Sequence, residues 1–372
     1  MWNAVSTYIT NLSNAVAVKQ SVKGEHITSK YFGIFFLILQ WYVIIGNLVA
    51  SLILRNSTGN QQTQLLPNIS SKHMYVNYTN YGDSNGTGLF FNLSQKQMAK
   101  NSYALCGSNY CHYHPIEHEG MKVDDTTKNI LLGVYTACGV ISLLVISLFL
   151  EPLKTYRGTS IECRVVLEQL TSVIKFFVDR RFMMLWLICM YGLMQNGFLT
   201  SEVTKAFVTC PLGVYMVGYV MICFGICGAI SSYASGWLNK HVGRITLLCT
   251  AAVTNLALMI FMLLWTPTAD LYVYFIVFGI WGIGNGIWSS QINSLVGTIF
   301  SDRSEEAFAS QRMLQGLGTT IGYFYAKHMC MMEKIYILGA ICVLGMILYI
   351  AMEIIFRRKN MHNEKIYKQT SV

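Results

Sequence analysis

The sequence is poor in charged residues. Only 12% of its 372 residues are Asp, Glu, Lys or Arg, whereas 53% are hydrophobic. A soluble domain carries about 25% charged residues, so this composition indicates a membrane protein. The N-terminal segment 1–30 also lacks the basic start, short apolar core and small-residue cleavage site of a secretory signal. We therefore expect the membrane spans themselves to direct insertion.

The chain has no motif that indicates catalysis or nucleic-acid binding. Its net charge of +9 comes from basic residues in short stretches between apolar runs, as is typical of membrane anchors and topology signals. We predict a non-enzymatic protein without cofactors or a bound metal. Its first partner is the lipid bilayer, and we expect no nucleic-acid partner.

Eight hydrophobic runs are long enough to cross a membrane, since a bilayer core about 30 Å thick requires roughly 20 apolar residues in a helix. The runs are 31–54, 129–150, 182–200, 212–235, 245–266, 271–292, 308–329 and 335–356. The seventh is the least apolar because it contains Arg312, Gln315 and several glycines, so we expect it to face protein or water instead of lipid. The predicted fold class is an all-α membrane protein with eight transmembrane helices.

The distribution of Lys and Arg predicts the orientation of the chain. Basic residues are concentrated in the linker 151–181 and the tail 357–372, and short loops rich in Lys and Arg stay on the cytoplasmic side. The segment 1–30 is assigned to the same side, so both termini are predicted to be cytoplasmic. The segment 55–128 is then a lumenal loop, either at the plasma membrane or in the endolysosomal system.

That loop contains N-x-S/T sequons, which are acceptors for N-glycosylation. They are Asn56, Asn68, Asn77, Asn85 and Asn92. A polar loop rich in Asn and Ser also produces sequons by chance. The distribution of Lys and Arg independently places this loop on the lumenal side, so we predict that the loop is glycosylated.

The same loop brings thiol and imidazole groups close together in sequence. Cys106 and Cys111 are followed by His112, His114 and His118. Two cysteines in an oxidising compartment favour a disulfide, so we predict a Cys106–Cys111 bond. A zinc site and a histidine cluster that gains charge at endosomal pH are the alternatives. The other nine cysteines lie in or near the spans and are interpreted as packing residues.

Polar and aromatic side chains occur at membrane depth in the sixth run. Asn285, Trp288 and Gln291 are spaced by three and share one broad helical face. Asn293 in the same region and Gln195 in the third run are further candidates. Two interpretations remain open, a cavity that binds a polar solute and hydrogen bonds between closely packed helices.

Ionisable residues lie close to the predicted ends of the spans. Glu202 follows the third run, and we expect a solvated carboxylate paired with Lys205. Arg312 and Glu353 lie near predicted cytoplasmic ends, where long side chains reach water. No proton relay is predicted.

One loop motif resembles that of a known superfamily. Gly236, Gly243 and Arg244 lie in a turn that is similar to the glycine and arginine loop of the major facilitator superfamily. The resemblance implies that the region 182–356 is the C-terminal six-helix half of a twelve-helix fold. The two spans of the region 31–150 then become helices five and six, and the first four helices are expected to be absent. A truncated gene model, a splice form and a complete shorter product are the alternatives.

The chain resembles the Unc-93 family of that superfamily more closely, and its A-type members most of all. The similar stretches are 31–38, 197–202, 217–224, 288–291 and 307–309. The resemblance implies a regulatory or trafficking partner of other membrane proteins, including potassium channels and innate immune receptors. A secondary transporter of a small solute is the alternative. Asn285 stands where an acidic residue is expected in the A-type relatives, which argues against proton coupling.

The C-terminus carries a short pattern of its own. Thr370, Ser371 and Val372 fit the free C-terminal sequence that peptide-groove domains accept by strand addition. A pattern of three residues also arises by chance. We keep such a domain as a predicted partner.

Overall fold

The computed structural model describes residues 2–65, 106–111, 125–149, 163–268, 270–326 and 328–370. In these ranges the chain is helical, and we find no β-strand in them, which confirms the all-α membrane class. The longer helices are α1 (Trp2–Gln20), α2 (Gly24–Leu39), α3 (Trp41–Leu65), α5 (Asp125–Phe149), α6 (Cys163–Phe177), α8 (Trp186–Gly197), α10 (Val214–Val242), α11 (Arg244–Leu264), α12 (Leu271–Ile299), α13 (Ser304–Ala326) and α14 (Met331–Thr370). Short elements join them, namely η1 (Gly107–Asn109), α7 (Arg180–Met183), the π-helix η4 (Phe198–Thr209), α9 (Cys210–Leu212) and η5 (Ser301–Arg303).

Six helical stretches of the described residues are long and apolar enough to cross a membrane. They are Gly24–Arg55, Asp125–Val145, Val214–Val242, Arg244–Leu264, Leu271–Ile299 and Met331–Ile355. The other two predicted spans, 182–200 and 308–329, are also largely helical. The first is divided among α7, α8 and η4, and the second is the polar helix α13.

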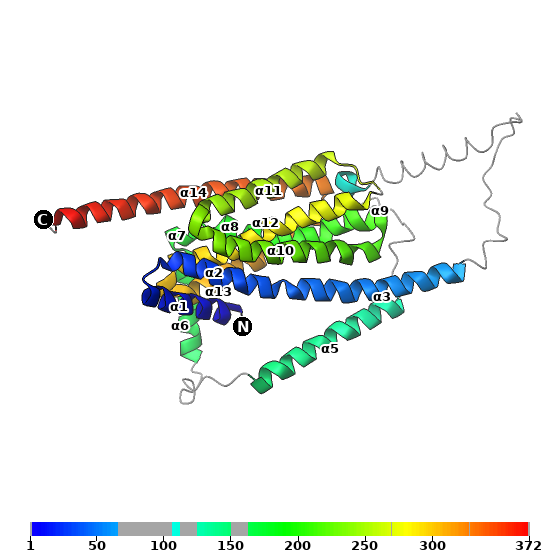
Figure 1. The fold of residues 1–372 in the computed structure, drawn as a ribbon, viewed down its shortest axis with the longest axis horizontal. Coiled ribbons are helices and arrows are strands. Elements are labelled where there is room, and N and C mark those ends of the chain that lie inside the picture. The colour runs from blue at the N-terminus through cyan, green and yellow to red at the C-terminus, as the bar shows by residue number, and fades with distance from the viewer. Residues whose placement is uncertain are drawn as a thin grey trace, which may run out of the picture.

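The predicted cytoplasmic segment 1–30 is largely helical. It forms α1 and the first turns of α2, and α1 packs against α2, α12 and α13. Small hydroxyl side chains form its buried face, where Ser13 Oγ lies 2.7 Å from Thr28 Oγ1 on α2. This segment is therefore part of the helix bundle (Figure 1).

The centre of the bundle is built on the close packing of α10 against α12. A Cβ atom on Gly282 would lie 2.3 Å from the carbonyl oxygen of Phe224, and one on Gly286 would lie 2.3 Å from that of Gly228. Larger residues at these two positions would push the helices apart. Small residues allow membrane helices to approach closely, and van der Waals contact and interhelical hydrogen bonds then stabilise the pair.

Helix α5 lies beside α3, away from the other long helices (Figure 1). Its Tyr135 hydroxyl donates a 3.0 Å hydrogen bond to the carbonyl oxygen of Gly46 on α3. Most of its apolar side chains are exposed, including Leu132, Leu143 and Leu148. The helix therefore presents an apolar surface to lipid or to the helices of a neighbouring membrane protein.

Candidate functional site

A partly open cavity of about 270 Å³ lies between α1, α2, α3, α8, α12 and α13, with the exposed side chains of Trp2 and Tyr42 on its wall. Asn285, Trp288 and Asn293 line it from α12, Asn196 lines it from α8, and Arg312 reaches it from α13. The sequence pattern had two interpretations, a solute cavity and hydrogen bonds between helices. The three α12 residues line a cavity, as the first interpretation expects.

Gln291 has the other role, that of a hydrogen bond between helices. Its side-chain nitrogen donates to Ser29 Oγ on α2 at 3.0 Å and to the carbonyl oxygen of Ser235 on α10 at 3.2 Å. Each step of three residues along an α-helix rotates the side chain by about 60° around the axis, so Gln291 points about 120° away from Asn285. It is fully buried between α2, α10 and α12.

Gln195 also joins helices. Its side-chain oxygen accepts a 2.6 Å hydrogen bond from Asn255 Nδ2 on α11, and the same nitrogen lies 3.4 Å from the hydroxyl oxygen of Tyr191. Asn255 was not among the predicted site residues, although it is the one carboxamide side chain in the run 245–266. All three side chains are fully buried, so this contact ties α8 to α11 in the core.

Arg312 is the cation of the cavity. Its Nη1 donates to Gln315 Oε1 at 2.7 Å and its Nη2 donates to Asn293 Oδ1 at 3.3 Å. Its guanidinium carbon lies 4.8 Å from the centre of the Trp2 ring, which is a cation–π distance. Arg312 is partly buried and borders the cavity, and the expectation that its side chain reaches water stays a prediction. The neighbouring Trp288 Nε1 is buried and has no hydrogen-bond partner among the described residues.

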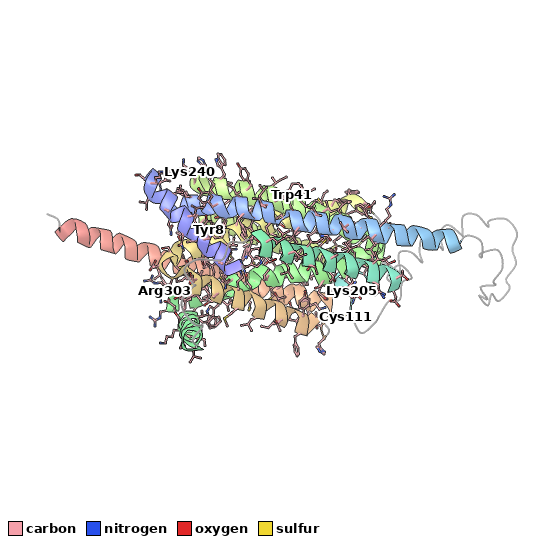
Figure 2. The ribbon with its side chains drawn as sticks, turned by 90° about the horizontal axis from the view of Figure 1, so that it is seen from below. Tyr8, Trp41, Cys111, Lys205, Lys240 and Arg303 are labelled. Carbon is pink, nitrogen blue, oxygen red and sulfur yellow. A yellow bond between two sulfur atoms is a disulfide. The ribbon has the colours of Figure 1, made fainter. Side chains whose placement is uncertain are left out.

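The two ends of the bundle carry different groups. Lys240 and Arg303, from segments predicted to be cytoplasmic, lie near one end, whereas Cys111 and Lys205, from segments predicted to be lumenal, lie near the other (Figure 2). Residues that are predicted to lie on opposite sides of the membrane thus lie at opposite ends of the bundle.

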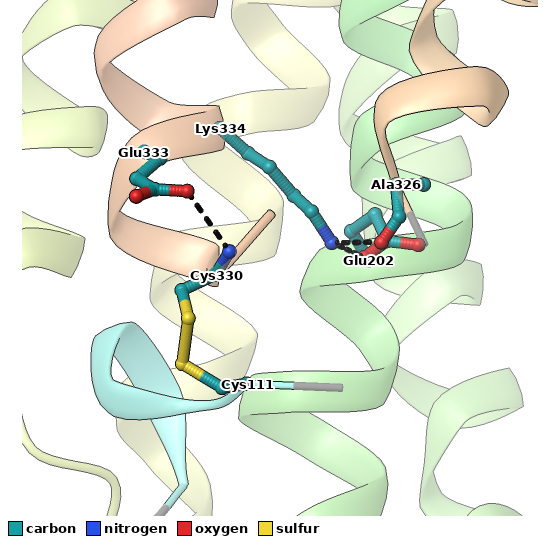
Figure 3. The surroundings of a disulfide bond; sticks show 6 residues. All are labelled: Cys111, Glu202, Ala326, Cys330, Glu333 and Lys334. Carbon is teal, nitrogen blue, oxygen red and sulfur yellow. Dashed lines mark hydrogen bonds and ion pairs between the residues drawn. A yellow bond between two sulfur atoms is a disulfide. The ribbon is translucent and has the colours of Figure 1, made fainter. Parts of the chain in front are cut away.

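Two disulfides fasten the segment 106–111 to the bundle. Cys106 bonds to Cys210 on α9, and Cys111 bonds to Cys330 before α14 (Figure 3). The predicted Cys106–Cys111 bond is therefore wrong, as is the interpretation of Cys210 and Cys330 as packing residues. The turn η1 lies between the two cysteines, and Gly107 takes a left-handed conformation there (φ +75°), so the thiols reach different helices.

The segment 106–111 makes further contacts on the same end of the bundle. Tyr110 accepts a 3.0 Å hydrogen bond from the backbone nitrogen of Met331, and Ser108 Oγ donates to the carbonyl oxygen of Leu263 at 3.4 Å. Its disulfides use both thiols, so neither cysteine is available as a thiolate ligand for zinc. The segment thus connects η4–α9, the end of α11 and the start of α14.

Glu202 pairs with a distant lysine. Its carboxylate lies 2.5 Å from Lys334 Nζ, which also donates to the carbonyl oxygen of Ala326 at 2.7 Å (Figure 3). The predicted Glu202–Lys205 pair is wrong because this stretch is a π-helix, in which residues three apart do not face each other. Lys205 instead lies 5.7 Å from the centre of the Tyr110 ring.

The loop motif also has a clear structural role. Gly243 has φ +84° between α10 and α11, a conformation that side chains disfavour, and Gly236 packs against Gly33 on α2. Arg244 is nearly buried and pairs with Glu25 on α2 at 3.4 Å. The motif therefore holds α2 against the α10–α11 turn.

Several predicted sites lie wholly or partly outside the described residues. The backbone of Asn56 belongs to α3 and that of Thr370 ends α14. The remaining ones are outside the described ranges: Asn68, Asn77, Asn85, Asn92, His112, His114, His118, Ser371 and Val372.

Comparison with known proteins gives consistent matches over most of the chain. The family model described as "Ion channel regulatory protein UNC-93" matches residues 6–350. "Protein unc-93 homolog A" of Homo sapiens is 34% identical over 354 residues, which is 94% of this chain and 70% of that protein. "Putative potassium channel regulatory protein unc-93" of Caenorhabditis elegans is 27% identical over 356 residues, which is 95% of this chain and 46% of that protein.

Proposed function

Because the chain belongs to the UNC-93 family, which confirms the resemblance seen in its sequence, we propose that it controls the activity or the trafficking of another membrane protein, such as a potassium channel or a receptor. The observation that carries this proposal is the match to the ion channel regulatory family over residues 6–350. The printed name of the relative from Caenorhabditis elegans, which describes potassium channel regulation, supports a channel as the partner.

The structure supports a regulatory membrane protein that acts by contact. The chain is a multi-pass membrane protein, and its helix α5 leaves a large apolar surface available to neighbouring helices. Contact with a partner requires only a folded surface of this kind. We infer that the protein acts without catalysis, as its family description suggests.

The location and the wider architecture are part of the same proposal. We propose the plasma membrane or the endolysosomal membrane, with both termini cytoplasmic and the segment 55–128 lumenal and glycosylated. The twelve-helix facilitator fold stays a prediction, and this chain spans 70% of the human relative's length. Thr370, Ser371 and Val372 stay the predicted contact for a peptide-groove domain.

Co-expression with individual potassium channels tests the proposal. The protein is expressed with each channel in cultured cells, and whole-cell current and the amount of channel at the cell surface are measured together. Trafficking control changes current and surface amount in proportion, whereas gating control changes current at a constant surface amount. A multi-pass protein of another family, expressed at the same level, is the control.

The result that would contradict the proposal is equally direct. If no channel or receptor of the panel co-purifies with the protein, and none changes in current or surface amount, the protein is not a regulator of this kind.

A further inference from the structure

Arg312 brings a positive charge into the helix bundle, and no carboxylate of the described residues pairs with it. A guanidinium group has five N–H donors and is always protonated. Its two hydrogen-bond partners, Gln315 and Asn293, are neutral amides. Among the residues that the structure describes, the ion pairs involve other cations, and Arg312 Nε is buried without a hydrogen-bond partner.

An uncompensated charge at this position is costly. Ionised groups inside a membrane bundle are stabilised by a partner of opposite charge or by water, and they commonly mark binding sites. Arg312 adjoins a cavity of about 270 Å³, so the missing partner has a place to bind.

The other groups around the cavity select the class of partner. Trp288 Nε1 is a second buried donor that finds no acceptor in the described part of the chain, and a Cβ atom on Gly192 would lie only 3.2 Å from it. The small residue at position 192 thus leaves room for the indole. Trp2, Phe36 and Tyr42 add aromatic surface to the same cavity. An anion with an apolar body would accept hydrogen bonds from the unpaired donors and pack against the aromatic side chains.

We propose that this cavity binds a small organic carboxylate, with Arg312 as its charge partner and Trp288 Nε1 as a second donor. A carboxylate accepts two parallel hydrogen bonds from a guanidinium, which suits the fork of an arginine. The cavity volume is slightly below the range of about 300–1,000 Å³ that is typical of ligand sites, so the ligand is small. This proposal is independent of the proposed control of a channel.

Thermal stability of the purified protein tests the proposal. The protein is prepared in detergent, and its midpoint of unfolding is measured with three matched pairs of probes: acetate and acetamide, benzoate and benzamide, indole-3-acetate and indole-3-acetamide. Each pair has nearly the same shape but differs in charge. A ligand that binds only the folded state raises the midpoint. We expect at least one carboxylate to raise it more than its amide does.

Variants then assign the effect to the cavity. Arg312→Gln should raise the dissociation constant of the stabilising carboxylate by about tenfold or more, because the charged partner is lost. Arg312→Lys keeps the charge but not the fork, and Trp288→Phe removes only the second donor, so both should weaken binding to a smaller extent. Arg303→Gln, which removes an exposed arginine at one end of the bundle, is the matched control and should leave binding unchanged.

Several outcomes would overturn the proposal. Equal shifts for carboxylate and amide, no shift for any probe, or unchanged binding in both Arg312→Gln and Trp288→Phe would each do so. Stabilisation by inorganic phosphate or by vesicles of anionic lipid, but by no carboxylate, would assign the cavity to a phosphate group instead. If Arg312→Gln does not fold, Arg312→Lys and Trp288→Phe decide the question.

Discussion

Removal of the two disulfides provides a strong test of how the lumenal end of the bundle is assembled. The perturbation is a pair of double variants, Cys106→Ser with Cys210→Ser and Cys111→Ser with Cys330→Ser. The first opens a loop of 104 residues and the second a loop of 219 residues. Both should lower the free energy of unfolding, because each bond restricts the unfolded chain.

The chain-entropy relation gives the size of the effect. Taken alone, closing these loops stabilises the folded state by about 4.7 and about 5.4 kcal/mol, and the second value is smaller while the Cys106–Cys210 bond is present, because that bond shortens the loop that Cys111–Cys330 closes. These values are upper bounds, since membrane helices remain formed in the unfolded state and already restrict the chain. We therefore expect losses of about 2–5 kcal/mol, the range measured for native disulfides in small secreted domains.

Two assays measure the result. Thermal unfolding in detergent compares each double variant with the parent protein, and mass spectrometry of non-reduced proteolytic peptides reads the connectivity. Cys138→Ser, which changes an exposed free thiol, is the control and should leave stability unchanged. A peptide in which Cys106 is bonded to Cys111 would refute the reasoning and restore the pairing expected from the sequence.

Three further predictions concern contacts between helices. Arg244→Gln should lower the free energy of unfolding, because Glu25 loses its cation. The loss should be only about 1–3 kcal/mol, since water reaches the partly exposed Glu25 carboxylate, and a double-mutant cycle with Glu25→Gln should show coupling between the two residues. Gly286→Val should reduce the yield of folded protein, since the new side chain would meet the backbone of α10. Gly316→Val is the control, because a side chain at position 316 has open space around it, and it should change the free energy of unfolding by no more than about 0.5 kcal/mol. Lys334→Gln should cost about 3 kcal/mol by leaving a mostly buried carboxylate on η4 without its cation, as thermal unfolding would show.

Topology could have predicted the disulfides better than local spacing did. Cys106 and Cys111 are close in sequence, and that proximity favoured a bond between them. Cys210 lies between the third and fourth hydrophobic runs and Cys330 between the seventh and eighth, so both were already on the predicted lumenal side. Four cysteines in one oxidising compartment allow three pairings, and spacing alone cannot choose among them.

Helical periodicity predicted which part of α12 matters, but not the role of each residue. Asn285 and Trp288 line the cavity, as one of the two interpretations expected. Gln291 follows at the same spacing and yet joins α2 and α10. The difference comes from the drift of a three-residue repeat around a helix of 3.6 residues per turn. Which side faces a cavity depends on the neighbouring helices, and their positions are not encoded in the local sequence.

The two predicted spans that lack an unbroken apolar helix of membrane length both line the larger cavity, together with the more apolar spans of α2–α3 and α12. The span 182–200 contributes Asn196 through α8, and the span 308–329 contributes Arg312 through α13. A second, much smaller cavity of about 10 Å³ also lies between these two stretches, beside Glu202. A helix that faces an internal cavity is free to carry amides and a cation that lipid would exclude. Polar side chains inside a predicted span therefore indicated the cavity, whether the span as a whole is strongly apolar, as in α12, or not, as in α13.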